Sequence, residues 1–509
     1  MDRKIVFYFL GNSLSAFSII FLFPVIYAAW EMKNFQTTLF FFLLGILAGV
    51  TGIFLIFLAR NHKRKLPVAV SALSMLLIYP ALAIFAMMPF IFFDWLSPLD
   101  AALDTVSDLT SAGISLLPGT APYILRLWQS VLMWFGSLIF LVLLVTIMPE
   151  VGGCFGINMS LQEGQNFSSH FGQMLEMSKK ILKIYSLLTL VSVIFFKLAG
   201  LNSWDSVLMA MRCISTGGGD FFPARGNFYV EYAAIFTMLM ACGNFLFLHR
   251  LIYTILPPIS HAKENIFRRT IYFFRRLKQN IFGNIKIFFT NSEVKAVLLI
   301  IFLGVGFIFL SIFHRGLIVD GNSAFRAAFF HVLSFLSTTG ITLGDIEKSH
   351  DFDKFLIFMT AIFGGCMGSV TGGLKMIRVI ILAKVTASEV KKTMHPQMVE
   401  SIRVNKIVVP QKIVGRILAY FFLCLITLFI CSAVLSYIDL EFSKAVGMSA
   451  ACLTNVGILP GICDPSDFLK LSVQGKIFCM IILIVGRLEI FALLLIPASL
   501  KFRRKNKKW

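Results

Sequence analysis

Charged residues are scarce in this chain. Lys, Arg, Asp and Glu make up 14% of its 509 residues, while 58% are hydrophobic. Soluble globular domains carry roughly 25% charged residues, so the composition excludes an ordinary water-soluble protein. The chain is predicted to be an all-α integral membrane protein, surrounded by the lipid bilayer.

Acidic residues are the scarcer of the two signs, with 26 Asp and Glu against 46 Lys and Arg and a net charge of +20. The basic residues concentrate in alternate connections between apolar segments, in the set that includes both termini, and the acidic residues in the opposite set. Positively charged loops stay on the cytoplasmic side of a membrane. Both termini are therefore predicted to be cytoplasmic, and the positive charge indicates topology rather than a nucleic-acid partner.

Signatures of catalysis and metal binding are absent from the sequence. The nine cysteines show no paired metal-ligand spacing, and the eight histidines form no HExxH motif. A membrane-embedded enzyme, the rival class, needs a nucleophile and a base on one face of a helix pair, and no such pattern occurs. We expect no enzyme and no bound cofactor. A cleavable signal peptide is not expected either, because the first apolar run is longer than a typical signal core.

Long apolar runs are plentiful. A helix that crosses the ~30 Å hydrocarbon core needs about 20 apolar residues. Ten transmembrane helices are predicted, at residues 5–29, 38–59, 66–93, 127–147, 184–200, 230–248, 296–313, 355–382, 413–437 and 476–500.

A short polar segment that ends in glycine occurs four times between these spans, each time after an apolar run too short to cross a bilayer. The copies are Thr110-Ser111-Ala112-Gly113, Ile214-Ser215-Thr216-Gly217, Ser337-Thr338-Thr339-Gly340 and Thr454-Asn455-Val456-Gly457. Recurrence at long, similar intervals indicates a repeated unit. Each copy is interpreted as a re-entrant pore loop that opens from the outside.

Such segments suit a particular purpose at membrane depth. Irregular backbone is tolerated there only when it is buried in protein or lines a watery cavity. Glycine lacks a Cβ, so four segments can crowd together and turn their carbonyls toward one axis. A ring of carbonyls replaces the hydration shell of a monovalent cation. We therefore expect the four copies to form a four-fold pseudosymmetric selectivity filter within one chain.

The repeats divide the chain. The predicted parts are an N-terminal two-helix hairpin (1–60), pore repeat 1 (61–150), pore repeat 2 (179–251), a basic amphipathic cytoplasmic linker (252–294), pore repeat 3 with a broken gating helix (295–384), a cytoplasmic linker (385–411), pore repeat 4 (412–501) and a basic cytoplasmic tail (502–509). Lipid-facing packing is favoured for the hairpin over partner contact. For the basic segment 263–286, anchoring at the inner leaflet is favoured over docking of a cytoplasmic partner.

Charged residues near the loops have two interpretations. Asp94, Asp100, Asp104 and Asp108 precede the first copy. They either raise the local cation concentration at a pore mouth or complement the dipole of the short helix, and the two roles are compatible. Arg212, in the short helix of the second repeat, should find a partner within the protein. The glycines that follow this copy are interpreted as a flexible exit.

Glycines also interrupt the predicted span 355–382. The candidate gate consists of Gly364, Gly365, Gly368, Ser369, Thr371, Gly372, Gly373 and Lys375, together with Arg487 in the last span. Five glycines, each unfavourable in a helix by roughly 1 kcal/mol, predict a helix broken in mid-membrane, and a hinge or gate is favoured over close helix packing. Arg487 either faces the pore as a barrier to cations or joins a structural ion pair. Its spacing makes a pair with Glu489 unfavourable.

These features resemble the TrkH branch of the Trk/Ktr/HKT potassium-transporter superfamily. The resemblance rests on the four copies with their short helices, the broken segment 364–378, the segment 390–396 and the stretch 486–491, and it covers nearly the whole chain. It implies four helix–pore loop–helix units around one pore, homodimers, a cytosolic ring of nucleotide-binding RCK (TrkA-like) subunits that controls opening, and a bacterial cytoplasmic membrane. The family's gating loop matches residues 364–375 and its pore-facing arginine matches Arg487.

The resemblance also bears on the ion. In HKT relatives a serine at the first filter glycine accompanies sodium preference, so Gly113 implies permeant K⁺ rather than Na⁺. The chain departs from the family at Ser111 and Ala112, where threonines are usual, and at Val370 and Thr371 in the gating loop, which bears on gate stiffness. The predicted function is gated K⁺ uptake. The alternative is a Na⁺- or H⁺-coupled cation symporter of the same fold.

Overall fold

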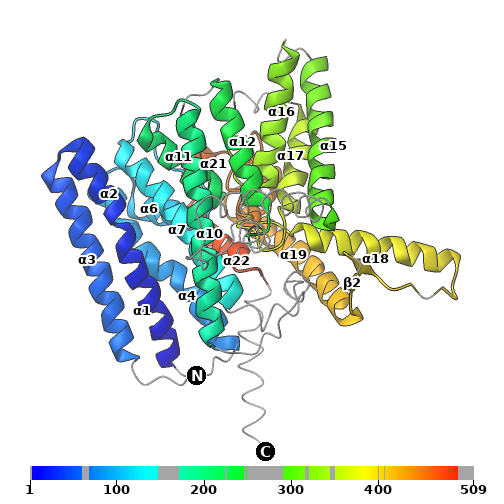
Figure 1. The fold of residues 1–509 in the computed structure, drawn as a ribbon, viewed down its shortest axis with the longest axis horizontal. Coiled ribbons are helices and arrows are strands. Elements are labelled where there is room, and N and C mark those ends of the chain that lie inside the picture. Colours follow the sequence, from blue (N-terminus) through cyan, green and yellow to red (C-terminus); the bar gives the residue numbers. More distant parts are fainter. Residues whose placement is uncertain are drawn as a thin grey trace, which may run out of the picture.

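The computed structural model describes residues 3–59, 68–146, 171–219, 221–223, 226–245, 248, 290–315, 320–343, 350–398, 400–405 and 407–490. These residues are mostly helical, with one two-stranded sheet (Figure 1). The predicted amphipathic segment 263–286 and the tail 502–509 lie outside the described residues.

Helices occur within each predicted span, although the helix in the last one ends at Arg487 and residues 491–500 of that span lie outside the described residues. They are α1 (Arg3–Ile20), α2 (Leu22–Tyr27) and η1 (Ala28–Met32), α3 (Phe35–Leu58), α4 (Val68–Ala86) with α5 (Met88–Phe92), α7 (Tyr123–Thr146), α10 (Phe171–Leu198), α12 (Phe228–Cys242), α15 (Ser292–His314), α17 (Asp351–Phe363) with α18 (Met376–Met394), α19 (Gln411–Ile438) and α22 (Val473–Arg487). Among the described residues, six helical stretches are long and apolar enough to cross a membrane. The chain therefore has the helices of a membrane protein.

The N-terminal helices α1 and α3 pack closely through small residues. A Cβ built on Gly11 would lie 2.7 Å from the carbonyl oxygen of Gly52, and one on Gly52 would lie 2.6 Å from Ser15 Oγ. Small residues let helix backbones approach when lipid supplies no hydrophobic drive between them. The opposite face of α3 leaves Leu43, Ile53 and other apolar side chains exposed, which suits contact with lipid.

In four places a long helix is followed by a short helix and then by another helix. The short helices are α6 (Pro98–Leu109), α11 (Ser203–Ser215), α16 (Gly321–Leu336) and α20 (Phe442–Thr454). Side chains cap the free N–H groups at the start of two of them, α6 and α16. Ser97 Oγ, for example, accepts from Asp100 N at 3.3 Å, and Asp320 Oδ2 accepts from Ser323 N at 3.0 Å.

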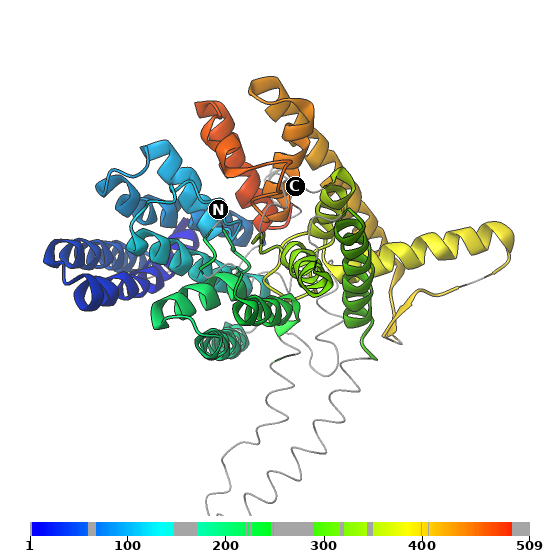
Figure 2. The same cartoon turned by 90° about the horizontal axis from the view of Figure 1, so that it is seen from above.

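These helices pack in a closed order. Helix α7 contacts α11, α12 contacts α16, α17 contacts α20, and α22 returns to contact α6. Seen from above, the corresponding parts follow one another around a common centre, from cyan through green and yellow-green to orange and red (Figure 2). The first and the fourth of these helix–short helix–helix units are thus neighbours.

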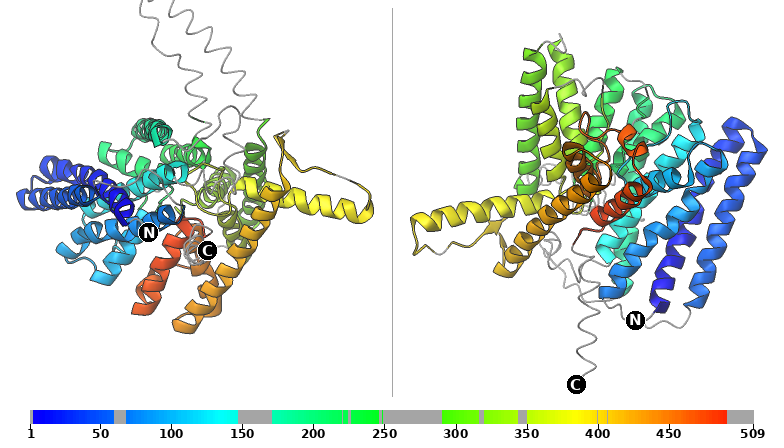
Figure 3. Two further views of the ribbon diagram at one scale, coloured as in Figure 1. Left: turned by 90° about the horizontal axis from the view of Figure 1, so that it is seen from below. Right: turned by 180° about the vertical axis from the view of Figure 1, so that it is seen from behind.

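Helix α18 projects away from the rest of the molecule (Figures 1 and 3). A hairpin of β1 (Arg403–Val404) and β2 (Ile407–Val408) accompanies it, with Arg403 opposite Val408 in antiparallel register. Lys384 Nζ donates to the carbonyl of Arg403 at 2.6 Å, which joins helix and hairpin. Asn405 Oδ1 accepts from Ser292 N at 2.8 Å, so the hairpin also caps the beginning of α15.

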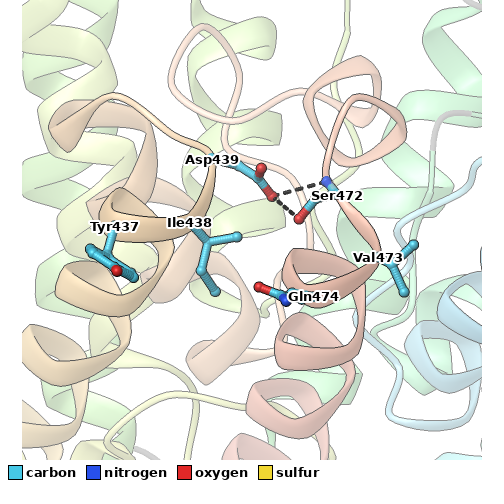
Figure 4. Close-up of a pocket in the computed structure, with 6 residues that line it drawn as sticks. All are labelled: Tyr437, Ile438, Asp439, Ser472, Val473 and Gln474. Atoms are coloured by element: carbon cyan, nitrogen blue, oxygen red, sulfur yellow. Dashed lines mark hydrogen bonds between the residues drawn. The ribbon is translucent and has the colours of Figure 1, made fainter.

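The start of α22 is fixed by a carboxylate at the end of α19. Asp439 Oδ2 accepts from Ser472 N at 2.9 Å and from Ser472 Oγ at 2.5 Å, beside a shallow hollow that Tyr437 and Gln474 also line (Figure 4). Nearby, α21 (Pro465–Leu469) carries Asp467, which pairs with Lys444 of α20 at 2.6 Å. These contacts position the connections around the fourth short helix.

Candidate functional site

The four short helices end in the same backbone turn. In each, one residue near the end of the segment donates its N–H to the carbonyl oxygen five residues earlier, at 2.8 to 3.1 Å. This donor is called the third position below. The pairs are Ala112 with Ser107, Gly217 with Arg212, Thr339 with Ser334, and Val456 with Ala451. This common bond defines equivalent positions in the four segments.

Backbone angles repeat in the same register. The second residue has a φ between 53° and 59°, and the glycine at the fourth position a φ between 51° and 79°. The second positions are Ser111, Thr216, Thr338 and Asn455, and the fourth positions are Gly113, Gly218, Gly340 and Gly457. Left-handed backbone strongly favours glycine, which explains the invariant fourth residue.

This register corrects one boundary of the sequence prediction. The second copy is Ser215–Gly218 and not Ile214–Gly217, because Gly218 takes the position of Gly113. Ile214 belongs to α11, two residues before the left-handed Thr216. Three consecutive glycines follow Thr216, so the sequence alone did not show which of them corresponds to Gly113. The hydrogen bonds and φ angles identify Gly218.

The structure brings the four segments together in a ring. A Cβ built on any fourth-position glycine would overlap or crowd a third-position carbonyl oxygen of the next segment. The contacts are Gly113 to Gly217, Gly218 to Thr339, Gly340 to Val456, and Gly457 back to Ala112. Each glycine is therefore required by close approach as well as by φ, and each carbonyl meets a neighbouring backbone without an intervening side chain.

Buried polar side chains support this ring. Ser137 of α7 joins Ser111 Oγ at 2.5 Å and donates to the carbonyl of Ser215 at 2.8 Å, so it links the first and second segments. Ser137 was not predicted, since a single serine in an apolar span carries no distinguishing signal. Arg212 is fully buried and donates from Nη1 to the Gly218 carbonyl at 3.0 Å and from Nε to Ser130 Oγ at 2.8 Å. Its expected partners are thus found within the protein.

Of the four acidic residues before the first segment, Asp94 precedes α6 and the other three lie within it. Asp100 lies in the first turn of α6 and pairs with Lys476 of α22 at 2.6 Å. Asp104 and Asp108 are fully buried within α6. Asp104 accepts from Leu116 N at 2.7 Å and from Gln129 Nε2 at 2.9 Å. Only Asp100 therefore matches the expected carboxylate at a helix N-terminus.

The predicted break in the glycine-rich span is present. Helix α17 ends at Phe363 and α18 begins at Met376, and the residues between them form a mostly buried, non-helical loop. Within it, Gly365 N donates to Thr371 Oγ1 at 3.1 Å, and Ser369 Oγ lies 2.6 Å from the same oxygen. Lys375 Nζ donates to the carbonyl of Ser369 at 3.2 Å and also to that of Thr371. Side chains of the loop therefore replace the missing helical bonds.

The loop lies directly against the ring. Gly372 N donates to Thr338 Oγ1 at 2.9 Å, and a Cβ on Gly372 would overlap the carbonyl oxygen of Thr454. Glu293, at the start of α15, accepts from Met367 N at 3.2 Å. Glu293 was missed, although a carboxylate next to a long apolar run was a usable signal. The loop is thus held by ring residues on one side and by α15 on another.

Arg487 connects the loop to the first segment. Its Nη1 donates to the Val370 carbonyl at 2.9 Å, and its Nη2 lies 3.2 Å from Ser137 Oγ and 3.4 Å from Ser111 Oγ. Glu489 pairs instead with Arg378 of α18, at 2.5 Å. Arg487 and Glu489 therefore have different partners, as expected, but helical spacing is not the reason, because Glu489 follows the end of α22 and has a φ of 53°.

Comparison with known proteins gives a consistent result. The family model described as "TrkH: Cation transport protein" matches residues 58–505. The Trk system potassium uptake protein TrkH of Vibrio parahaemolyticus is 25% identical over 97% of this chain and 98% of its own length. An uncharacterized cation transporter of Methanocaldococcus jannaschii is 25% identical over 99% and 97%.

The fold agrees with a solved structure. The crystal structure of the potassium transporter TrkH from Vibrio parahaemolyticus superimposes with a TM-score of 0.82 at 23% identity, covering 97% of this chain and 98% of the other. Since the family model spans nearly the whole sequence, this chain belongs to the TrkH family of cation transport proteins, which are transporters and not enzymes.

Proposed function

We propose that the protein carries out K⁺ uptake across the cytoplasmic membrane through a pore lined by the four glycine-ended segments. The observation that carries the proposal is the closed ring, in which each third-position carbonyl meets the glycine of the neighbouring segment. Backbone carbonyls at such close quarters can take the place of water around a dehydrated monovalent cation. The four helix–short helix–helix units then form one pore, with ten membrane-spanning helices in all.

Potassium is the favoured permeant ion. All four fourth positions are glycine, so the ring has no side-chain hydroxyl at this level, and Gly113 stands where sodium-preferring relatives of the superfamily carry serine. The curated relatives are named potassium uptake proteins, which supports the same ion. Nothing in the contacts described favours coupled movement of Na⁺ or H⁺.

The loop 364–375 is proposed as the gate and Arg487 as a barrier beside it. The loop crosses next to Thr338 and Thr454 of the ring. Arg487 donates to the Val370 carbonyl of the loop and brings a buried positive charge next to the ring. This charge opposes the passage of cations. Opening requires the Gly372–Thr338 and Arg487–Val370 contacts to separate.

Passive uptake suffices for accumulation. A membrane potential of about 100 mV, inside negative, contributes about 2.3 kcal/mol per charge, which corresponds to roughly fifty-fold accumulation. We further propose a homodimer, both termini in the cytoplasm, and a cytosolic RCK (TrkA-like) ring that controls the gate. The relatives' names, which place them in a Trk system, support this partner.

The proposal is tested by Rb⁺ uptake in cells that lack their own potassium uptake systems, with and without a co-expressed RCK subunit. Wild type is expected to restore growth at low K⁺. The variant Gly113→Ser should lose uptake or its preference for K⁺ over Na⁺, because its Cβ would overlap the Gly217 carbonyl at a φ of 74°. Gly119→Ser is the matched control, since a Cβ there has nothing within 4 Å. Absence of uptake with every partner, from correctly inserted protein, would refute transport.

A further inference from the structure

In three of the four segments, the side chain at one equivalent position binds the backbone at the end of the segment. It is the residue whose carbonyl accepts the bond from the third position. In the first segment it is Ser107, whose Oγ accepts from Ile114 N at 2.7 Å, and in the third it is Ser334, whose Oγ donates to the Ile341 carbonyl at 2.7 Å. Both bonds hold the residue that follows the fourth-position glycine. In the fourth segment the position is Ala451, which has no hydrogen-bonding side chain.

The second segment uses a guanidinium for the same purpose. Arg212 occupies the equivalent position and donates to the Gly218 carbonyl at 3.0 Å. A Cβ on Gly219 would lie 2.9 Å from Arg212 Nη1, and Gly219 has a φ of 85°. The third consecutive glycine therefore makes room for the buried arginine, which is a more specific reason than a flexible exit.

The charge of Arg212 is embedded in a buried network behind the ring. Its Nη2 donates to Gln129 Oε1 at 3.4 Å, and Gln129 Nε2 donates to Asp104 Oδ2 at 2.9 Å. Asp108 interacts electrostatically with both Asp104 and Arg212. Among the residues that the structure describes, neither carboxylate oxygen of Asp108 has a hydrogen-bond partner. A buried guanidinium and two buried carboxyl groups thus lie behind the first two segments.

We propose that Arg212 is a specificity-determining residue for permeation, acting as a fixed positive charge at the glycine level of the ring. It engages the Gly218 carbonyl, so this oxygen is less available to an ion than its three counterparts. It also lowers the affinity of the ring for cations, and for divalent cations most strongly. The inference rests on the proposed function, because it assumes that the ring binds the permeant ion.

The charge dependence separates this role from simple support of the fold. A change in electrostatic potential alters the binding free energy in proportion to ionic charge. The change in affinity for a divalent ion should therefore be the square of the change for a monovalent ion. A change in ring geometry alone has no reason to follow that relation.

The test uses the full-length protein in proteoliposomes, with Rb⁺ uptake as the signal and external Ba²⁺, which has nearly the radius of K⁺, as the inhibitor. For Arg212→Gln, the half-saturating Rb⁺ concentration should fall about fivefold. The half-inhibiting Ba²⁺ concentration should fall about twenty-five-fold, the square of that factor, because the repulsion doubles with the ionic charge. Arg212→Lys keeps the positive charge but loses the several N–H donors of the guanidinium group, so the shifts for both ions should be much smaller. Equal shifts for the two ions, or none, would overturn the proposal.

Two further variants keep the outcome decisive. If Arg212→Gln is not recovered as folded protein, Arg212→Ser carries the same expectation, because serine already serves at this position in the first and third segments. Arg326→Gln removes another short-helix arginine, paired with Glu231 at 2.5 Å, and should give smaller shifts. Wild-type proteoliposomes that take up neither K⁺ nor Rb⁺ would instead refute the proposed function itself, and this inference with it.

Discussion

The contact between the loop and the ring offers a direct test of gating. Gly372 N donates to Thr338 Oγ1 at 2.9 Å, and this bond must break if the loop moves aside. The substitution Thr338→Val removes the hydroxyl while keeping the β-branched shape at a φ of 56°. Because shape and backbone preference are preserved, the expected effect is on the loop and not on the ring.

The magnitude follows from the buried amide. A typical hydrogen bond contributes about 1 kcal/mol net, and a buried donor left without a partner costs about 1–3 kcal/mol. Each 1.4 kcal/mol changes an equilibrium constant tenfold. The ratio of closed to open protein should therefore fall about fivefold or more. The fraction of time spent open should rise by the same factor while it is small.

The assay is single-channel recording or K⁺ flux from proteoliposomes, with the zero-current potential in K⁺ and Na⁺ as a check on selectivity. Thr360→Val is the matched control, since Thr360 is also buried but its hydroxyl bonds to the Ile357 carbonyl of its own helix. An unchanged or lower open fraction in Thr338→Val, with unchanged selectivity, would refute the assignment of the loop as the gate.

Three other predictions concern the same region and the outer connections. Gly372→Ala should give a large constitutive leak of K⁺ because its Cβ would overlap the Thr454 carbonyl, whereas Gly415→Ala, with nothing within 4 Å, should behave as wild type in the same flux assay. Arg487→Gln should raise K⁺ flux about tenfold, since a buried positive charge opposes cations and its bond to the Val370 carbonyl is lost; lower flux would contradict its role as a barrier. Burial tends to raise the pKa of Asp467, but hydrogen bonds from Lys444 and from Asp464 N lower it overall below its usual 3.8. Its stabilisation is therefore complete above that pH and lost as pH falls through the lowered value, so melting curves should show an acid-dependent loss that Asp467→Asn lacks.

Much of the site could be predicted from local sequence. The cluster of glycines between residues 364 and 373 predicted a broken helix, and the helix ends at Phe363, because helix propensity is a local property that tertiary contacts here reinforce. The buried charge of Arg212 predicted a partner by electrostatics alone. That partner lies on α7, at Ser130, which only the packing of α11 against α7 determines.

What could not be predicted depends on long-range geometry. The register of the second segment follows from φ values at Thr216 and Gly218, which neighbouring glycines conceal. Ser137 links three parts of the chain through one hydroxyl, and nothing in its apolar surroundings distinguishes it from a lipid-facing serine. The roles of the ring and the loop in ion passage stay predictions until the measurements above are made.

A ring assembled from one polypeptide differs from a ring of identical subunits in one respect. In a homotetramer any substitution appears in every quadrant, so a buried guanidinium beside one carbonyl would be accompanied by three more, and their mutual repulsion would be severe. Here Arg212, Ser107, Ser334 and Ala451 stand at equivalent places with different chemistry. Each quadrant can thus be adjusted independently, which gives a single gene fine control over the electrostatics of a shared opening.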